Sequence, residues 1–286
     1  MENILEKLKI KNIRDLRLIG GGDVSSAYKV YTDDNTYYLQ VRENSKKSFY
    51  DGEICGLKLF EKLDIPAPRV VDNGFSQTDA YLLLTFLNEG RIPSYKELAE
   101  VVAKIHYYKN PEGKFGFAYP YEGRAICFTN EWTDSWSDLF INQRMDRLRG
   151  ELVEKELWKD DLARKYQEVK NIMINELDKQ KSVPSLLHGD LWGGNHMFLV
   201  DGSPVVFDPS PLYGDREFDI GISTCFGQFP NEFYQKYQEI YPLESGYELR
   251  IEFYRLYLFM VHQLKFGDAY EDAVIDTIDN ILKQAN

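Results

Sequence analysis

The sequence changes character at residue 88, and this change limits the folds that the chain can adopt. After a short leading helix, residues 1–87 contain short runs rich in β-branched and aromatic residues, separated by polar turns. The strand candidates are 16–19, 27–31, 37–42, 69–72 and 81–86. From residue 88 onward the pattern is mostly helical. We therefore expect an α+β protein with a small β-rich lobe over 1–87 and a larger helical lobe over 88–286.

The helices are predicted from apolar residues that recur at helical spacing. One is expected in the first lobe, over 48–63. Asn73-Gly74 and the polar residues after it are expected to form the turn between the last two strands. In the second lobe, helices are predicted from Ser94 and at 135–149, 153–180, 216–227, 231–240, 247–265 and 269–284. Between them, 186–199 and 205–207 are short apolar stretches that Gly, Asp and Asn interrupt.

Composition excludes several classes of partner. The net charge of −12 disfavours nucleic acid and anionic membranes, because both attract a basic surface. No stretch approaches the length of about 20 apolar residues that a spanning helix needs, and the N-terminus does not read as a signal peptide. The three cysteines are widely spaced, which suits a reducing compartment. We expect a cytoplasmic protein.

One segment indicates chemistry: His188-Gly189-Asp190-Leu191-Trp192-Gly193-Gly194-Asn195, followed by a short apolar run and Asp208-Pro209. Asp190 and Asn195 have the spacing of the catalytic-loop Asp and Asn of protein kinases, with Gly in place of Arg. There a carboxylate accepts the proton of an attacking hydroxyl, while an amide oxygen and a second carboxylate hold a metal ion on ATP. We therefore predict a magnesium-dependent kinase with Asp190 as the base and with Asn195 and Asp208 as Mg²⁺ ligands.

Some of these features have a second interpretation. An Asp-x4-Asn pair also arises by chance, but the ordered set of motif residues favours function. His188 is expected to orient the loop through a hydrogen bond rather than to act as the base. Gly20-Gly21-Gly22, between two strand candidates, is expected to cover phosphates, although a hairpin turn uses the same residues. It is not a Walker A loop, because no Gly-Lys-Ser/Thr follows.

Together these motifs resemble the fructosamine kinase (ketosamine-3-kinase) family, which shares its fold with aminoglycoside phosphotransferases and choline kinases. The most discriminating motif is Asp190-Leu191-Trp192-x-Gly194-Asn195, because related phosphotransferases commonly have another residue at the Trp position. The resemblance runs nearly end to end, and the other motifs are Gly20-Gly21-Gly22-Asp23, Asn130-Glu131-Trp132 with Trp136, Phe207-Asp208-Pro209, Glu217-x-Asp219 and Phe266-Gly267-x-x-Tyr270.

The resemblance implies a two-lobed protein-kinase-like fold and a reaction. The family transfers phosphate from ATP to the third-carbon hydroxyl of a ketosamine, which is a sugar rearranged onto an amine. The product then falls apart and frees the amine, so the reaction is a deglycation. The implied partner is a small-molecule ketosamine or another glycated amine. Sugar length, the amine and the oligomeric state are left open by the sequence.

The resemblance also assigns residues to the nucleotide. Asp190, Asn195 and Asp208 keep the roles given above, and the triplet at 20–22 becomes the phosphate loop. Adenine is expected at the hinge, near Thr85 and Leu87, where backbone groups mainly hold it. Thr85 stands where relatives often have Glu.

Other residues are implied to support the loop or the acceptor. Asp219 is expected to brace the catalytic loop without touching the substrate. Trp192, Trp132 and Tyr270 are candidates for contacts with the sugar or its amine substituent, because aromatic faces suit both. Each also fits a place in the core, and for Trp136 we favour the core.

The pattern breaks at Gln40. Kinases of this fold place a Lys on the third strand and pair it with a Glu on the following helix. Here Gln40 occupies the Lys position, while Glu53 remains. Arg42 lies on the same strand face, two positions along. We hypothesise that Arg42, or else Lys46 or Lys47, supplies the missing cation of the nucleotide site; the alternative is a weak or inactive kinase.

Three functions are therefore compared. The first is a ketosamine kinase, and the second is a kinase of the same fold for an aminoglycoside, choline or a similar amine-alcohol. The third is a non-catalytic nucleotide-binding or scaffold protein. Trp192 and the motif at 130–140 disfavour the second function, and intact Asp190, Asn195 and Asp208 disfavour the third.

Overall fold

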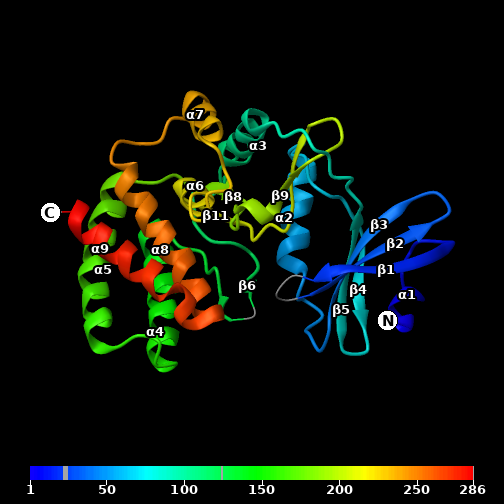
Figure 1. Cartoon of the computed structure of the whole chain (residues 1–286), viewed down its shortest axis with the longest axis horizontal. Helices are drawn as coiled ribbons and strands as arrows, with labels where there is room; N and C mark the ends of the chain where they lie inside the picture. The colour runs from blue at the N-terminus through cyan, green and yellow to red at the C-terminus, as the bar shows by residue number, and fades with distance from the viewer. Residues whose placement is uncertain (22–24, 124, 286) are drawn as a thin grey trace. The chain divides into compact units, whose positions relative to one another are not determined.

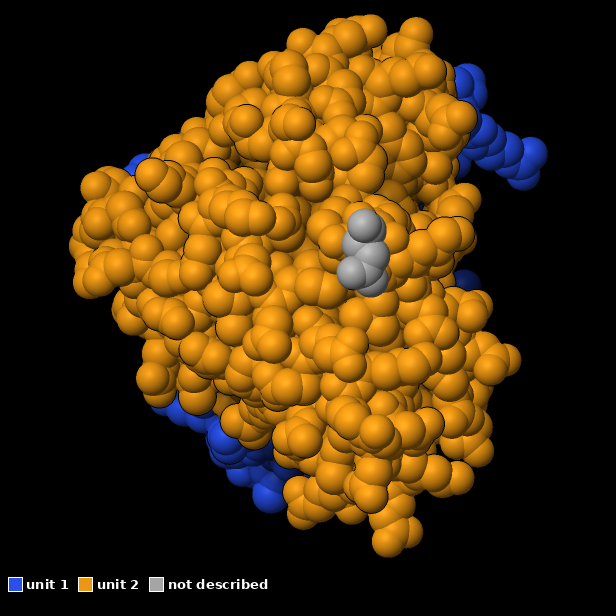
Figure 2. All heavy atoms as spheres, turned by 90° about the vertical axis from the view of Figure 1, so that its left-hand side faces the viewer, with its two compact units in different colours: residues 1–94, 197–209 blue, residues 95–196, 210–286 orange. Residues whose placement is uncertain are grey.

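The structure is a computed structural model that describes residues 1–21, 25–123 and 125–285. The chain divides into two compact units, coloured separately in Figure 2. Unit 1 comprises residues 1–94 and 197–209, and unit 2 comprises residues 95–196 and 210–286. Asp208 therefore belongs to unit 1, whereas Asp190 and Asn195 belong to unit 2. The functional division expected at residue 88 stays a prediction.

A five-stranded antiparallel sheet forms the body of unit 1 (Figure 1). Its order is β1-β2-β3-β5-β4, with bounds Ile13–Gly21 (β1), Ser26–Thr32 (β2), Thr36–Arg42 (β3), Asp79–Thr85 (β5) and Val70–Ser76 (β4). Two helices belong to the same unit, α1 (Glu2–Leu5) and α2 (Asp51–Lys62). A short ribbon of β9 (His196–Phe198) and β10 (Pro204–Val206) ends just before Asp208.

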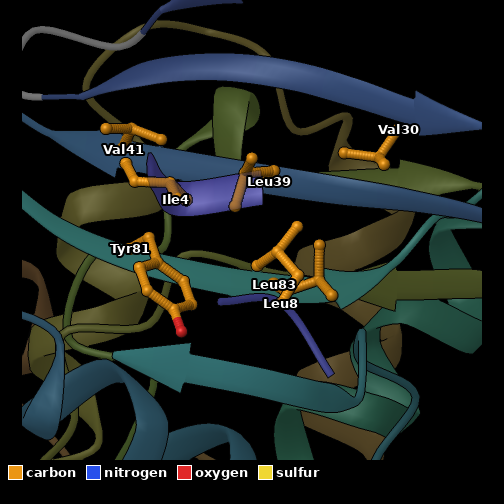
Figure 3. Close-up of a cluster of buried hydrophobic side chains, with 7 residues drawn as sticks. All are labelled: Ile4, Leu8, Val30, Leu39, Val41, Tyr81 and Leu83. Carbon is orange, nitrogen blue, oxygen red and sulfur yellow. The ribbon is translucent and has the colours of Figure 1, made fainter. Parts of the chain in front are cut away.

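Alternation along the strands places one set of apolar side chains on a shared face of this sheet. Figure 3 shows the resulting cluster, in which the N-terminal segment covers the strands. Its buried members are Ile4, Leu8, Val30, Leu39, Val41, Tyr81 and Leu83. Each large side chain buried in this way contributes roughly 1.5–3 kcal/mol. The N-terminal segment is therefore part of the core of unit 1.

The turn that we expected at Asn73-Gly74 is wrong. Both residues lie inside β4, where they pair with Leu82 and Tyr81 of β5. The chain reverses at 77–78 instead, and Gln77 there has a φ of 57°. A left-handed residue suits a tight hairpin, so β4 ends four residues later and β5 begins two residues earlier than their composition indicated.

Unit 2 is mostly helical. Its α-helices are α3 (Tyr95–Tyr107), α4 (Asp146–Glu154), α5 (Asp160–Gln180), α6 (Glu217–Ser223), α7 (Asn231–Ile240), α8 (Tyr247–Phe266) and α9 (Glu271–Gln284). A π-helical turn, Asp138–Met145, leads into α4, and 3-10 turns lie at Gly193–Asn195 and Gly267–Tyr270. The long helix α8 packs against α6 and α9, and α3 packs against α7 (Figure 1).

Short strand pairs complete unit 2. They are β8 (Ser185–Leu187) with β11 (Leu212–Gly214), and β6 (Tyr121–Glu122) with β7 (Cys127–Phe128). The pairing of β8 with β11 matters for function, because the segment after β8 begins with His188. Among the described residues, no helix is long and apolar enough to span a membrane.

Candidate active site

The side chain of Asn195 holds the loop after β8 together through hydrogen bonds to Asp190. The Nδ2 group of Asn195 donates a hydrogen bond to the backbone oxygen of Asp190 and a second to its carboxylate Oδ2, each at 2.8 Å. Asn195 is 5% exposed, and the 3-10 turn Gly193–Asn195 carries it back over the loop. The amide nitrogen thus positions Asp190, and the role of the amide oxygen of Asn195 as a metal ligand stays a prediction.

Asp219 on α6 fixes the backbone at the start of this loop. Its Oδ2 accepts a hydrogen bond from the His188 N–H at 2.7 Å, and its Oδ1 accepts one from the Gly189 N–H at 2.9 Å. Both His188 and Asp219 are fully buried. Hydrogen bonds to a carboxylate are about twice as strong as neutral ones. In addition, the Asp190 N–H donates to Nδ1 of His188 at 3.4 Å, so the imidazole contacts the loop backbone.

Gly189 is required by the path of the chain. Its φ of 81° lies in the left-handed region, and a Cβ at this position would lie 1.8 Å from the Ser210 carbonyl oxygen. The Ser210 N–H also donates to the His188 oxygen at 2.8 Å. Any side chain here would force the two backbone segments apart, so the Arg of protein kinases is excluded from this position.

A buried histidine supports Asp219. Nε2 of His106 lies 3.0 Å from Oδ2 of Asp219, and Nδ1 lies 2.7 Å from the Tyr237 hydroxyl. Burial lowers the pKa of His106, so the ring is neutral. Because Asp219 only accepts, Nε2 carries the proton and Nδ1 accepts from Tyr237. Arg216 donates to the same hydroxyl at 3.2 Å. Sequence reasoning missed His106, which lies 113 positions from Asp219.

A second cluster lies in unit 1, around Asp208. Nε2 of Gln40 on β3 donates to Oδ1 of Asp208 at 3.0 Å. Oε1 of Glu53 on α2 is buried and has no hydrogen-bond partner among the residues that the structure describes. Burial, and then the charge of Asp208, raises the pKa of Glu53, and burial also raises the pKa of Asp208. Burial and these two carboxylates raise the pKa of Tyr38 to about 12. Unit 1 thus holds two buried acids whose charged forms are disfavoured by their surroundings.

Gln40 therefore binds Asp208. The lysine that this fold usually has here pairs instead with the helix glutamate, which is Glu53 in this chain. The guanidinium of Arg42 lies 5.6 Å from the centroid of the Phe49 ring. Lys46 and Lys47 are exposed in the segment after β3. The choice among these three cations stays a prediction.

The remaining nucleotide candidates lie in unit 1. Gly20 and Gly21 end β1 opposite Ala27 and Ser26, and Gly20 has a φ of 145°, which other residues rarely adopt. Gly22 lies outside the described residues. At the end of β5, the Thr85 N–H donates to the Arg69 oxygen and its hydroxyl accepts from the Arg69 N–H, both at 2.9 Å.

Leu87, the expected hinge residue, lies two residues after the end of β5, and its side chain is half-buried. The roles of the glycines, Thr85 and Leu87 toward ATP stay predictions.

The sequence model of the fructosamine kinase family matches residues 2–284. The chain belongs to this family. A probable ketoamine kinase of Staphylococcus aureus is 51% identical to this family member over 282 residues, which cover 99% of this chain and 98% of that protein. A chloroplastic protein-ribulosamine 3-kinase of Oryza sativa is 30% identical, over 98% of this chain and 82% of that protein.

Solved structures of similar proteins show the fold class of this chain. A structure from Haemophilus somnus that is assigned to the fructosamine-3-kinases has a TM-score of 0.84 and 31% identity, and the match covers 94% of this chain and 92% of that one. Aminoglycoside phosphotransferase APH(4)-Ia has a TM-score of 0.70 at 17% identity, covering 99% and 98%, and shows the fold alone. The expected α+β, kinase-like fold is confirmed.

The aromatic residues of the family motifs occupy different environments. Trp136 is 3% exposed and donates from its indole N–H to the Tyr254 hydroxyl at 3.0 Å, so its expected core position is confirmed. Trp132 is 46% exposed. Trp192 is half-buried, and Tyr270 packs 5.0 Å from the ring of His262. For Trp192, Trp132 and Tyr270, contact with substrate stays a prediction.

Asn130, another residue of the family motifs, has a structural role. Asn130 has a φ of 57°, donates to the Tyr119 oxygen at 3.0 Å and accepts from the guanidinium of Arg144. Arg144 is 3% exposed and also donates to the Tyr257 hydroxyl at 3.0 Å. Within the motif at 130–140, Asn130 and Trp136 therefore belong to the interior of unit 2. Sequence reasoning missed Arg144, because a buried cation bound mainly to neutral groups has no local signature.

Proposed function

We propose that this protein transfers the terminal phosphoryl group of ATP to the third-carbon hydroxyl of a ketosamine. Membership of the fructosamine kinase family supports the reaction class. The observation that carries the proposal within this chain is the catalytic loop, where Asn195 binds Asp190 and Asp219 binds the backbone N–H groups of the two residues before it. Three free cysteines, Cys55, Cys127 and Cys225, support a reducing, cytoplasmic location.

Asp190 is proposed as the general base. It takes the proton of the acceptor hydroxyl while the oxygen forms a bond to the γ-phosphorus and the bond to the β-phosphate oxygen breaks. The hydrogen bond from the Asn195 amide nitrogen to Oδ2 limits the rotation of the carboxylate, and a second bond from the same nitrogen holds the backbone oxygen of Asp190. Positioning of this kind removes reorganisation from the reaction step and is a large part of catalysis in phosphoryl transfer.

Mg²⁺ is proposed as the metal, with Asn195 and Asp208 as ligands. The donors fit this ion, because amide and carboxylate oxygens suit a small hard cation. Within the described residues the buried Oε1 of Glu53 has no hydrogen-bond partner, which supports a place for a cation in unit 1. When bound, the cation would neutralise charge on the ATP phosphates. Gln40 would keep Asp208 oriented through its 3.0 Å hydrogen bond.

A substrate screen tests the proposal. ADP release is measured with ATP and Mg²⁺ on fructosamine and ribulosamine derivatives of lysine, beside kanamycin and choline. Turnover is expected with the ketosamines alone. Phosphorylation of kanamycin or choline would instead identify another amine-alcohol kinase, and nucleotide binding without transfer would identify a non-catalytic protein.

Asp190→Asn tests the role of the base in the same assay. We expect kcat to fall by a factor of about 10²–10⁴, because general-base catalysis contributes an effect of this size. Asp178→Asn is the matched control, since Asp178 is exposed on α5. An Asp190→Asn variant that keeps full kcat would remove Asp190 as the base.

A further inference from the structure

A cavity of about 810 Å³ lies within unit 2, and no residue assigned above to phosphoryl transfer lines it. Its walls come from α6, α7, the first turns of α8 and the segment between α7 and α8. The lining residues are Ile220, Thr224, Tyr234, Gln235, Tyr237, Gln238, Glu239, Leu243, Tyr247, Glu248, Ile251 and Glu252. Its volume is within the usual range of about 300–1,000 Å³ for small-molecule sites.

The lining has the chemistry of a cation site. Within the part of the chain that the structure describes, it contains Glu239, Glu248 and Glu252 but no lysine or arginine. Tyr234 and Tyr247 add aromatic faces, which also attract ammonium and guanidinium groups. Anionic ligands are disfavoured, because three carboxylates would repel them.

Neighbouring cations only partly neutralise these acids. Lys236 lies 3.8 Å from Glu239, but it also binds Glu100 at 3.4 Å. Arg255 lies 3.7 Å from Oε1 of Glu252, whereas Oε2 of Glu252 is buried without a hydrogen-bond partner. Burial raises the pKa of Glu252, as expected for a carboxylate that lacks donors. A cation bound nearby would stabilise the charged form of this carboxylate.

One wall residue connects the cavity to the catalytic loop. Tyr237 lines the cavity, and its hydroxyl lies 2.7 Å from Nδ1 of His106. His106 contacts Asp219 at 3.0 Å, and Asp219 holds the backbone N–H groups of His188 and Gly189. Each step is a direct contact between buried groups, so a ligand that orders Tyr237 acts on the anchor of the loop.

We propose that this cavity is a second binding site, for a small molecule bearing an amine or guanidinium group, and that its occupancy steadies the catalytic-loop anchor. The site is separate from the phosphoryl-transfer residues and does not depend on the ketosamine assignment. The cationic head is placed at Glu252 and Glu248, and the apolar body of the ligand packs on Ile251 and Leu243.

Calorimetric titration of the full chain tests binding. The probes are butylguanidine, butylamine and 1-pentanol, which have similar length and differ in charge. Both cations are expected to bind and the alcohol is not. Glu252→Gln should weaken butylguanidine binding by at least about tenfold, because it removes the charged partner. Glu248→Gln is a second variant, and because Glu248 is exposed, this substitution is expected to leave the fold intact.

Two controls separate this site from the active site. Glu232→Gln is the matched control, because Glu232 is exposed on α7 and does not line the cavity. Asp190→Asn should bind butylguanidine as the natural protein does. Equal binding by the natural protein, Glu252→Gln and Glu248→Gln would overturn the proposal, as would loss of binding in Asp190→Asn or equal binding of the alcohol.

Amide hydrogen exchange tests the link to the loop. Saturating butylguanidine should slow exchange at His188 and Gly189 severalfold, and Tyr237→Phe should abolish the slowing while binding persists. Unchanged exchange at both amides would overturn the proposed effect on the loop. This readout needs no substrate, so it is independent of the proposed kinase activity.

Discussion

The two clusters that carry the candidate active site differ in how well their charges are compensated. In unit 2, the carboxylate of Asp219 has three partners: the N–H groups of His188 and Gly189 and the ring of His106. In the described part of unit 1, Asp208 accepts a hydrogen bond from Gln40, and Oε1 of Glu53 has no hydrogen-bond partner. The catalytic loop is thus held by protein groups, whereas the described hydrogen bonds leave the acids of unit 1 only partly satisfied.

This difference teaches which part of the site the protein preorganises. The carboxylate of a general base must be oriented before the substrate binds, so the groups that hold it are buried and either neutral or fully paired. Two neighbouring carboxylates destabilise a fold by repulsion and desolvation unless a cation joins them. We infer that a metal ion bound with ATP would remove this cost in unit 1.

The largest effect is expected when one acid is neutralised in each unit. Asp219→Asn should lower the free energy of unfolding by about 3 kcal/mol, because buried donors lose a charged acceptor. Glu53→Gln should leave the free energy of unfolding of the metal-free protein unchanged or raise it, since it removes repulsion. Urea unfolding at pH 7.5 without metal measures both. Equal destabilisation by the two variants would break the contrast between the units.

Gln40→Lys asks whether unit 1 lacks only a positive charge. A lysine at position 40 would lie near Asp208, which now accepts a hydrogen bond from the Gln40 amide. It could also pair with Glu53, as the usual lysine of this fold does with its helix glutamate. We expect the free energy of unfolding without metal to rise by about 2 kcal/mol, as two buried acids gain a counter-ion. Gln40→Met, which is similar in size and neutral, is the control. A lysine variant no more stable than the methionine variant would mean that the acids are already compensated.

Arg42→Ala tests which cation serves the nucleotide. If Arg42 supplies the missing charge, its removal should weaken ATP binding about tenfold, which corresponds to about 1.4 kcal/mol. Lys46→Ala and Lys47→Ala are the comparisons, because both lysines are exposed in the next segment and should change the affinity less than twofold. Calorimetric titration with ATP and Mg²⁺ measures all three, and an unchanged affinity in Arg42→Ala would leave the role to another group.

The same contrast explains what the sequence could predict. Strand alternation and helical spacing are local, so all five strands of the first lobe and most helices were expected, with errors at ends such as Asn73-Gly74. The loop motif is also local, since Asp190 and Asn195 lie five positions apart. Asp219 was reached only through the family resemblance, because its contacts span about thirty positions. His106 and Arg144 have no local signal, since tertiary packing alone determines what a buried polar group contacts.

The smallest expected effect concerns His106, and it tests whether the anchor in unit 2 is neutral. Burial places the pKa of His106 below its ordinary value of 6.5. The unfolded chain therefore binds more protons than the folded one as pH falls below 6.5, and folding loses stability there, with a slope of at most about 1.4 kcal/mol per pH unit. His106→Gln keeps a donor for Asp219 but cannot titrate. The free energy of unfolding of the natural protein, minus that of the variant, should shrink by about 1 kcal/mol between pH 7.5 and pH 5.5. Urea unfolding at three pH values measures this difference, in which the other titrating groups cancel. A difference that grows on acidification would mean that His106 is protonated and ion-paired with Asp219, so that the loop would be anchored by charge rather than by a neutral hydrogen-bond chain.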